Sequence, residues 1–185
     1  MIGSSMDVKP TALPGVLLIE PKLFGDARGC FMETFSARRY AEHGIVGSFV
    51  QDNYSRSRHG ILRGLHFQLH KPQSKLVQVL RGEVFDVAVD LRRSSPHFGK
   101  WAGEILSAEN HRQLFIPAGF AHGFVVLSEE ADFVYKCGEY YAPEFERTLM
   151  WNDPAIGIEW PIDFAPVLSA KDQAGKLLAD CECFE

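Results

Sequence analysis

The stretch SKLVQVLRGEVFDVAVDLRR, residues 74–93, decides the fold class of this chain. Val and Leu recur at alternate positions on both sides of an Arg-Gly-Glu break, which is typical of strands with one buried face. The glycine suits a tight turn, so we expect two strands around it. Four more strand-like segments follow at intervals of roughly ten residues and end in turn-forming residues: 99–107, 111–120, 121–129 and 131–141. This rhythm predicts an all-β sandwich or barrel.

The length and composition predict a single soluble domain spanning residues 1–185, with residues 1–12 as a flexible N-terminus. Of the 185 residues, 46% are apolar and 23% are charged, which is ordinary for a globular protein. No apolar run approaches the roughly 20 residues of a membrane span. The N-terminus shows no secretory signal, so we expect a cytoplasmic protein. Helices are expected at 36–44, between a capping Ser36 and Gly44, and over LSAKDQAGKLLADC, from about residue 168 to residue 181.

The four cysteines form no dense framework and no paired metal-binding motif, so free thiols are expected. The net charge of −5 argues against a nucleic-acid binder. However, the segment 53–82 contains six Lys or Arg and no acidic residue. A basic zone on an acidic protein suggests a small anionic ligand, although a solvated basic face is the plainer alternative.

Two histidine-containing motifs raise the question of a metal site. The first is RGLHFQLHKPQSK at 63–75, and the second is IPAGFAHGF at 116–124. Together they resemble the two metal-binding elements of the cupin superfamily, whose barrels hold a divalent metal through three His and a carboxylate. Here Gln68 stands where the second His would be, and Lys75 stands near the place of the carboxylate. We therefore expect no metal and a cupin-type double-stranded β-helix, or jelly-roll barrel, with a few short helices.

A narrower resemblance extends over roughly residues 15–175. The segments that carry it are GDARGCFMETF at 25–35, FVQDNYSRSRHGILRGLHFQ at 49–68, GEVFDVAVDLRRSSPHFGKW at 82–101, LSAENHRQLFIPAGFAHGF at 106–124, FVYKCGEYYAPEFER at 133–147 and WNDPAIGIEWP at 151–161. In this order they resemble the dTDP-4-dehydrorhamnose 3,5-epimerases. The resemblance implies inversion of two carbons beside the ketone of dTDP-4-dehydro-6-deoxy-D-glucose, without a cofactor, in dTDP-rhamnose and lipopolysaccharide O-antigen biosynthesis.

The resemblance also implies catalytic roles. His66 is the expected base, because imidazole has a pKa near neutrality. Asp172 matches the family carboxylate that hydrogen-bonds this histidine, although it could instead only cap the last helix. Tyr135 matches the family acid, and Lys75 with Arg63 could stabilise an enolate oxygen.

Further residues are expected to bind the nucleotide sugar. The resemblance assigns them as Phe24, Arg28, Glu33, Gln51, Asn53, Arg63, His122, Tyr140, Glu146 and Lys171. Arg and Lys suit a diphosphate, and the aromatics could stack on thymine. Surface ion pairing is the alternative for Arg28 and Glu33, and a structural remnant of a metal site is the alternative for His122. The segment 24–29 is expected to be an exposed turn, and the resemblance implies a homodimer, formed through sheet extension, in which this turn reaches the neighbouring subunit's site.

Three other functions stay open at this point. The chain could be a relative that inverts one carbon or shifts the ketone of another nucleotide-linked keto sugar. It could be a non-catalytic cupin that binds a sugar or an anion. A metal dioxygenase is the third alternative. We expect a nucleotide-sugar ligand, and neither a nucleic acid nor a membrane as partner.

Overall fold

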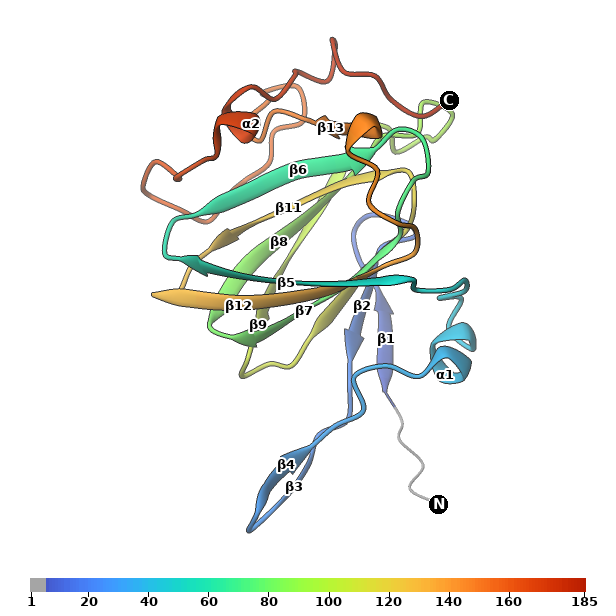
Figure 1. Ribbon diagram of the computed structural model, residues 1–185, viewed down its shortest axis with the longest axis vertical. Helices are drawn as coiled ribbons and strands as arrows, with labels where there is room; N and C mark the ends of the chain where they lie inside the picture. Colours follow the sequence, from blue (N-terminus) through green and yellow to red (C-terminus); the bar gives the residue numbers. More distant parts are fainter. Residues whose placement is uncertain (1–5) are drawn as a thin grey trace.

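The computed structural model describes residues 6–185 and consists of two β-sheets that face each other (Figure 1). The six-stranded sheet has the order β1-β2-β10-β7-β12-β5, with bounds Asp7–Pro10, Leu17–Glu20, Gln113–Ile116, Lys75–Arg81, Glu130–Cys137 and Gln51–Arg58. The five-stranded sheet has the order β13-β6-β11-β8-β9, with bounds Glu146–Thr148, Leu62–Gln68, Phe120–Val126, Glu83–Asp90 and Trp101–Ser107. The predicted all-β class is confirmed.

The decisive stretch forms both predicted strands, but they do not pair with each other. Strand β7 pairs with β10 and β12, whereas β8 pairs with β11 and β9. The turn at Gly82 therefore carries the chain from one sheet to the other. Gly82 has a φ of 75°, and a Cβ there would lie 2.0 Å from the backbone oxygen of Glu130. Only glycine suits this crossing.

The space between the sheets is filled by apolar side chains over most of its length. One cluster joins Val77 and Phe133 of the six-stranded sheet to Ala88 and Phe124 of the five-stranded sheet. A second cluster covers the other face of the five-stranded sheet with residues from the C-terminal segment, such as Leu149. The two clusters fix the five-stranded sheet from both sides.

The helices are short. Helix α1, Ala37–Ala41, begins after Ser36, and the chain turns at Gly44 with a φ of 82°. Helix α2, Ala170–Gln173, is a single turn, shorter than the apolar pattern after residue 168 suggested. A 3₁₀ turn, η1, occupies Pro143–Phe145. No helix among residues 6–185 is both long and apolar enough to cross a membrane.

Part of the segment 1–12, whose flexibility stays a prediction, forms a strand. Residues 7–10 form β1, which pairs antiparallel with β2 along its whole length. Val8 also packs against a cluster that includes Tyr40 and Phe115. Apolar contact and backbone pairing together hold this strand on the sheet. Residues 1–5 lie outside the described part of the chain.

A small hairpin stands apart from both sheets. Its strands β3, Phe24–Asp26, and β4, Gly29–Phe31, pair only with each other. Figure 1 shows the hairpin projecting beyond the end of the barrel, away from α2 and the C-terminus. The side chain of Phe31 is 66% exposed. An isolated two-stranded hairpin is marginal by itself, which raises the question of what it contacts.

Candidate active site

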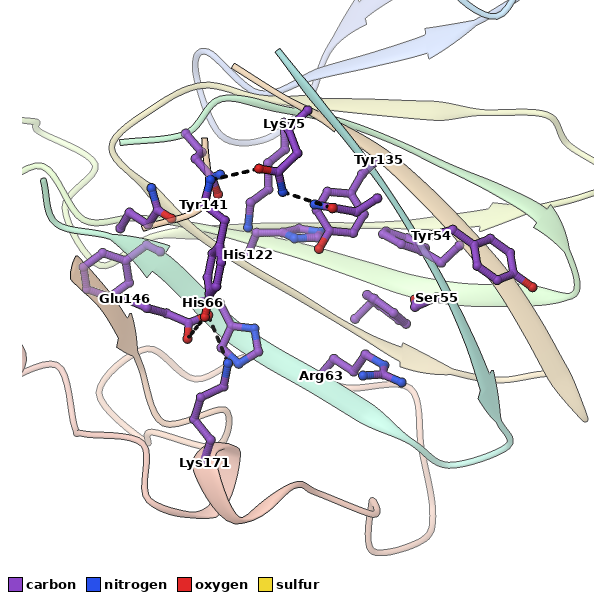
Figure 2. Close-up of a pocket in the computed structure, with 17 residues that line it drawn as sticks. Tyr54, Ser55, Arg63, His66, Lys75, His122, Tyr135, Tyr141, Glu146 and Lys171 are labelled. Atoms are coloured by element: carbon purple, nitrogen blue, oxygen red, sulfur yellow. Dashed lines mark hydrogen bonds and ion pairs between the residues drawn. The ribbon is translucent and has the colours of Figure 1, made fainter. Parts of the chain in front are cut away.

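A cavity of about 430 Å³ opens between the two sheets (Figure 2). Its walls come from β5, β6, β7, β11, β12, β13 and α2. The predicted residues that line it are Gln51, Asn53, Arg63, His66, Lys75, His122, Tyr135, Glu146 and Lys171. Residues from widely separated parts of the sequence thus meet in one polar chamber with an aromatic wall.

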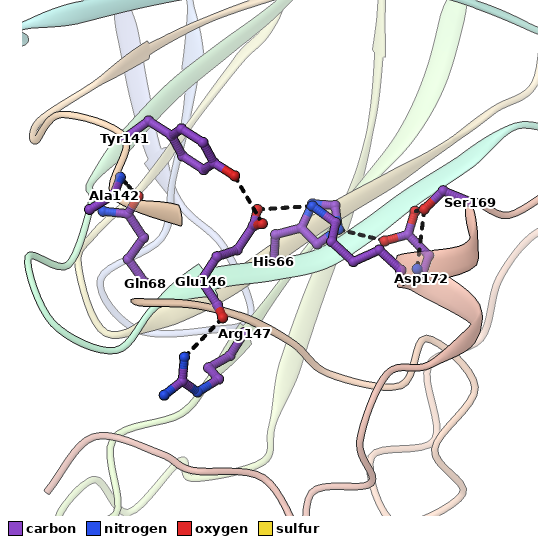
Figure 3. A network of polar contacts seen from close by, with 9 residues as sticks. His66, Gln68, Tyr141, Ala142, Glu146, Arg147, Ser169 and Asp172 are labelled. Atoms are coloured by element: carbon purple, nitrogen blue, oxygen red, sulfur yellow. Dashed lines mark hydrogen bonds and ion pairs between the residues drawn. The ribbon is translucent and has the colours of Figure 1, made fainter. Parts of the chain in front are cut away.

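His66 and Asp172 form a hydrogen-bonded pair behind the cavity wall. Nε2 of His66 lies 2.5 Å from Oδ1 of Asp172, although 106 residues separate them (Figure 3). The other carboxylate oxygen accepts a hydrogen bond of 2.8 Å from the Ser169 hydroxyl. Because Nε2 faces the carboxylate, Nδ1 is the nitrogen left for a ligand.

Helix α2 holds Asp172 in this place. Ser169 is its N-cap and accepts a hydrogen bond from the backbone N–H of Asp172 at 3.1 Å. The carboxylate is 3% exposed. Burial raises the pKa of Asp172, but the hydrogen bond and charge of His66 outweigh it, so the pKa falls below the ordinary value of 3.8. Asp172 therefore both belongs to the first turn of the helix and orients His66.

Tyr135 approaches the cavity from the opposite sheet. It lies on β12, whereas His66 lies on β6, so the phenol and the imidazole face the same space from two sides (Figure 2). Burial raises the pKa of Tyr135, and the nearby thiol of Cys137 acts in the same direction. The phenol is thereby kept protonated, as a proton donor requires.

Lys75 and His122 lie deeper. The ammonium of Lys75 is 6.0 Å from the centre of the Tyr135 ring, and burial lowers its pKa. His122 pairs in register with His66 and stacks on Phe133. Its Nε2 is 2.9 Å from a carboxylate oxygen of Asp86, a residue with no exposed surface.

The donor set does not suit a metal ion. Both amide atoms of Gln68 are engaged with backbone groups, since Oε1 accepts from the N–H of Ala142 and Nε2 donates to Lys71 and Tyr140. The ammonium of Lys75 would repel a dication. Gln68 thus fastens the 139–142 loop to the barrel.

Charged and polar groups surround the mouth of the cavity. Glu146 accepts hydrogen bonds from Nζ of Lys171 at 3.0 Å and from the Tyr141 hydroxyl at 3.2 Å (Figure 2). Nε of Arg63 donates to Ser57 at 2.9 Å, and Arg63 forms no ion pair among residues 6–185. A guanidinium and an ammonium at one opening provide a site for an anion.

Gln51 and Asn53 line the cavity from β5. Nε2 of Gln51 donates to Oδ1 of Asn53 at 3.0 Å, and Oε1 of Gln51 accepts from the backbone N–H of Tyr141 at 2.9 Å. The amide of Asn53 also lies 3.6 Å from the sulfur of Cys137. These contacts fix the orientation of two amides beside Tyr135, which pairs in register with Asn53.

Four predicted binding residues do not line this cavity. Phe24 and Arg28 lie on the projecting hairpin, where Arg28 is ion-paired with Asp26. Glu33 is ion-paired with Arg39 of α1. Tyr140 is 62% exposed on the loop.

Sequence reasoning missed several lining residues, namely Tyr54, Ser55, Phe67, Gln68, Gln73, Phe124, Phe133 and Tyr141. Most stand in strands where an alternating pattern predicts a core position equally well. The Tyr-Tyr pair at 140–141 offered no local signal for which ring faces inward. The hydrogen bond from the Tyr141 backbone to Gln51 decides it, and that contact spans 90 residues of sequence.

Comparison with known proteins now identifies the family. The family model described as dTDP-4-dehydrorhamnose 3,5-epimerase matches residues 10–180. The chain belongs to this family. Its 60% identity to the dTDP-4-dehydrorhamnose 3,5-epimerase of Pseudomonas aeruginosa extends over 174 residues, which are 94% of this chain and 96% of the relative.

Solved structures of the epimerase family agree. The dTDP-6-deoxy-D-glucose-3,5-epimerase of Legionella pneumophila, in complex with dTDP-4-keto-L-rhamnose, is 55% identical with a TM-score of 0.94, covering 96% of this chain and 95% of its own. A 3′-monoepimerase of Streptomyces bikiniensis, in complex with dTDP-quinovose, is 34% identical with a TM-score of 0.87, covering 92% and 87%. The predicted family, cupin-type fold and epimerase class are confirmed.

Proposed function

We propose that this protein inverts C3 and C5 of dTDP-4-dehydro-6-deoxy-D-glucose to give dTDP-4-dehydro-L-rhamnose. The observation that supports it most is the placement of His66 and Tyr135 on opposite sheets around one cavity. A sugar ring between them presents one face to a base and the other to an acid. Inversion needs both, because the proton leaves one face and another arrives on the opposite face.

The steps balance without any electron transfer. Nδ1 of His66 removes the proton from the carbon beside the ketone, while Nε2–H remains hydrogen-bonded to Asp172. The electron pair of the C–H bond forms the carbon–carbon double bond of an enolate, whose oxygen is stabilised by the ammonium of Lys75. The enolate carbon then takes a proton from the Tyr135 hydroxyl on the other face. Solvent removes the proton from the His66 imidazolium and returns one to the Tyr135 phenolate. The same steps at the second carbon complete the reaction, and no redox cofactor or metal takes part.

The charges at the mouth support recognition of the diphosphate. Arg63 and Lys171 supply the cations, and Gln51 with Asn53 supplies amides for the rest of the nucleotide. Lys171 must exchange its contact with Glu146 for one with the ligand, or share it. Of the basic zone from Asn53 to Gly82, Arg63 and Lys75 line the cavity, whereas Arg56 and Arg81 pair with acidic residues outside it.

The projecting hairpin supports a homodimer in which each cavity is completed by the other subunit. Phe24, Arg28 and Glu33 lie outside the cavity of their own chain, and the hairpin extends beyond the barrel (Figure 1). The outer face of the six-stranded sheet also exposes Leu80, and Nε2 of the buried Gln78 has no hydrogen-bond partner among residues 6–185. In a dimer with twofold symmetry, each hairpin would reach the other subunit, and Arg28 would lie near the diphosphate of the ligand bound there.

Turnover in deuterated water tests the function. The purified protein is incubated with dTDP-4-dehydro-6-deoxy-D-glucose, and deuterium is located by NMR. We expect label at both C3 and C5, and rhamnose formation when the following ketone reductase is added. His66→Asn is expected to abolish turnover and leave nucleotide-sugar affinity within about tenfold, or about 1.4 kcal/mol. A near-normal rate in this variant would show that His66 is not the base.

A second function is favoured by one comparison. The 3′-monoepimerase of Streptomyces bikiniensis shares this fold at 34% identity. Deuterium at only one ring carbon would show that the protein inverts a single carbon. Binding of the sugar without any deuterium exchange would show that the protein is a non-catalytic sugar-binding cupin.

A further inference from the structure

The carboxylate of Asp86 lies beneath the cavity floor and has no role in the proton transfers above. On β8, Val84 and Ala88 belong to the cluster between the sheets, whereas Phe85 and Val87 belong to the cluster on the other face. Strand alternation therefore turns Asp86 into the space between the sheets. None of its surface is exposed. A charged group in such a place requires a partner.

His122 fixes this carboxylate. Its Nε2 lies 2.9 Å from one carboxylate oxygen of Asp86 and 3.1 Å from the other, so this single nitrogen faces both oxygens. Burial lowers the pKa of His122, so the imidazole donates a hydrogen bond to Asp86 more readily than it supplies a positive charge. Burial alone would favour a neutral Asp86, so an ionised Asp86 needs a cation elsewhere in the cavity.

Three cations line the cavity together with His122, namely Arg63, Lys75 and Lys171. Arg63 donates to Ser57, whereas the ammonium of Lys75 lies 6.0 Å from the centre of the Tyr135 ring. Burial lowers the pKa of Lys75, the charges of Cys137, Asp86 and Glu146 raise it, and that of Lys171 lowers it. The two acids among them differ, because Glu146 is already paired with Lys171 at 3.0 Å. Nζ of Lys75 forms no ion pair within residues 6–185 at 4.0 Å or less. Asp86 is therefore the acid left to balance Lys75 through space.

We propose that Asp86 is a positioning residue whose charge, held in place by His122, keeps Lys75 an ammonium facing the cavity. The inference rests on the proposed function, since it concerns the cation assigned to the enolate oxygen. Burial lowers the pKa of Lys75 and raises that of Asp86, while each charge opposes the shift of the other. One buried cation and one buried anion thus compensate each other's charge.

A titration that does not depend on turnover tests this inference. Lysine labelled with ¹⁵N at Nζ is incorporated, and the Lys75 signal is assigned through Lys75→Arg. In Asp86→Asn, which keeps the shape and the acceptor for His122, we expect the pKa of Lys75 to fall by at least about one unit. Asp90→Asn is the matched control, because Asp90 is equally buried on β8 but bonds Arg92 and Ser95 instead. It should leave the Lys75 titration unchanged.

Kinetics then connect the charge to catalysis. Asp86→Asn is expected to lower kcat at least about tenfold with KM within about threefold, as for an interaction made in the transition state. In a Lys75→Met background the same change should cost nothing further. Thermal melting verifies that each variant is folded. If Asp86→Asn does not fold, Asp86→Glu takes its place. Because Asp86→Glu keeps the negative charge, it should retain the wild-type titration of Lys75, and a shifted titration would contradict the inference.

The outcomes separate the two proposals. An unchanged Lys75 titration in folded Asp86→Asn overturns this inference while leaving the epimerase proposal intact. A wild-type protein that leaves the sugar unchanged overturns the proposed function, whatever the titration shows. A fall in kcat that persists in the Lys75→Met background also overturns the inference, because Asp86 would then act through another group.

Discussion

The carboxylate of Asp172 receives a hydrogen bond from His66 and another from Ser169, so each of its oxygens is engaged. This arrangement fixes the tautomer of His66. In the proposed mechanism it also stabilises the imidazolium that forms when His66 takes the proton of the sugar. Neither function survives replacement by an amide, which can present an N–H to the ring instead of an acceptor.

Asp172→Asn is therefore expected to lower kcat by at least about a hundredfold. Asp153→Asn is a suitable control, because Asp153 is a buried carboxylate in the same C-terminal segment that caps backbone N–H groups outside the cavity. A steady-state assay under saturating substrate measures both. Equal losses in the two variants would mean that stability, rather than orientation of the base, is affected.

The lowered pKa of Asp172 also predicts a pH dependence of stability. Because the folded-state pKa lies below 3.8, the group stabilises the fold above that value and loses this contribution as the pH falls through the folded pKa. The difference in unfolding free energy between wild type and Asp172→Asn should be larger at about pH 7 than at about pH 3. Urea denaturation at the two pH values measures it, and a constant difference would contradict the linkage.

Individual residues could be predicted from the sequence where a motif fixes the local geometry. His66, Lys75 and Tyr135 all lie in strands and line the cavity as expected. Asp86 could not be found in this way, because an alternating strand predicts only that its side chain shares a face with Val84 and Ala88. Its function depends on Lys75 and His122, which come from other strands.

At the scale of the elements, the close approach of β6 and β11 shapes the cavity. The register between them shifts between His122 and Phe124, at Gly123. A Cβ on Gly123 would lie 2.6 Å from the backbone oxygen of Arg63 and 2.9 Å from the Leu65 side chain. The absence of a side chain therefore lets His122 and His66 stand opposite each other.

Gly123→Ala is expected to destabilise the fold by about 1–3 kcal/mol, because backbone atoms must move to relieve the overlap. Turnover should fall with it, since His122 moves relative to His66. Gly25→Ala is the control, because a Cβ there meets nothing closer than 3.8 Å. Denaturant midpoints compare the three proteins, and a Gly123→Ala midpoint equal to that of wild type would show that the strands can separate freely.

The elements themselves were predictable to different degrees. Alternation identified β7 and β8 and the turn between them, since these properties are local. It could not show that Gly82 leads from one sheet into the other, because strand pairing depends on residues far away in sequence. The length of α2 was overestimated for the same reason, as backbone contacts of Lys176 with Thr148 and Met150 end the helix early.

For the whole molecule, the proposed exchange of hairpins predicts how mixed subunits behave. His66→Asn lacks the base but has an intact hairpin, whereas Arg28→Ala has an intact base and a defective hairpin. Heterodimers of the two contain one cavity in which both are intact, so mixing two inactive proteins should restore about a quarter of wild-type activity.

The mixture is prepared by unfolding and refolding the two variants together, and sedimentation verifies the dimer. A His66→Asn, Arg28→Ala double variant mixed with inactive His66→Asn serves as the control and should recover nothing. Failure of the first mixture to recover activity, with heterodimers present, would show that the hairpin serves its own subunit or none.

The distance in sequence between His66 and Asp172 has a consequence for the growing polypeptide. The imidazole leaves the ribosome 106 residues before the carboxylate that orients it. Most strands of the barrel can assemble in that interval, yet the nascent protein possesses a base without its partner. In the proposed mechanism, chemistry on a nucleotide sugar therefore begins only after Asp172 has followed the barrel strands out of the ribosome. A protease that removes the segment carrying Asp172 is expected to silence the enzyme while sparing most of the barrel.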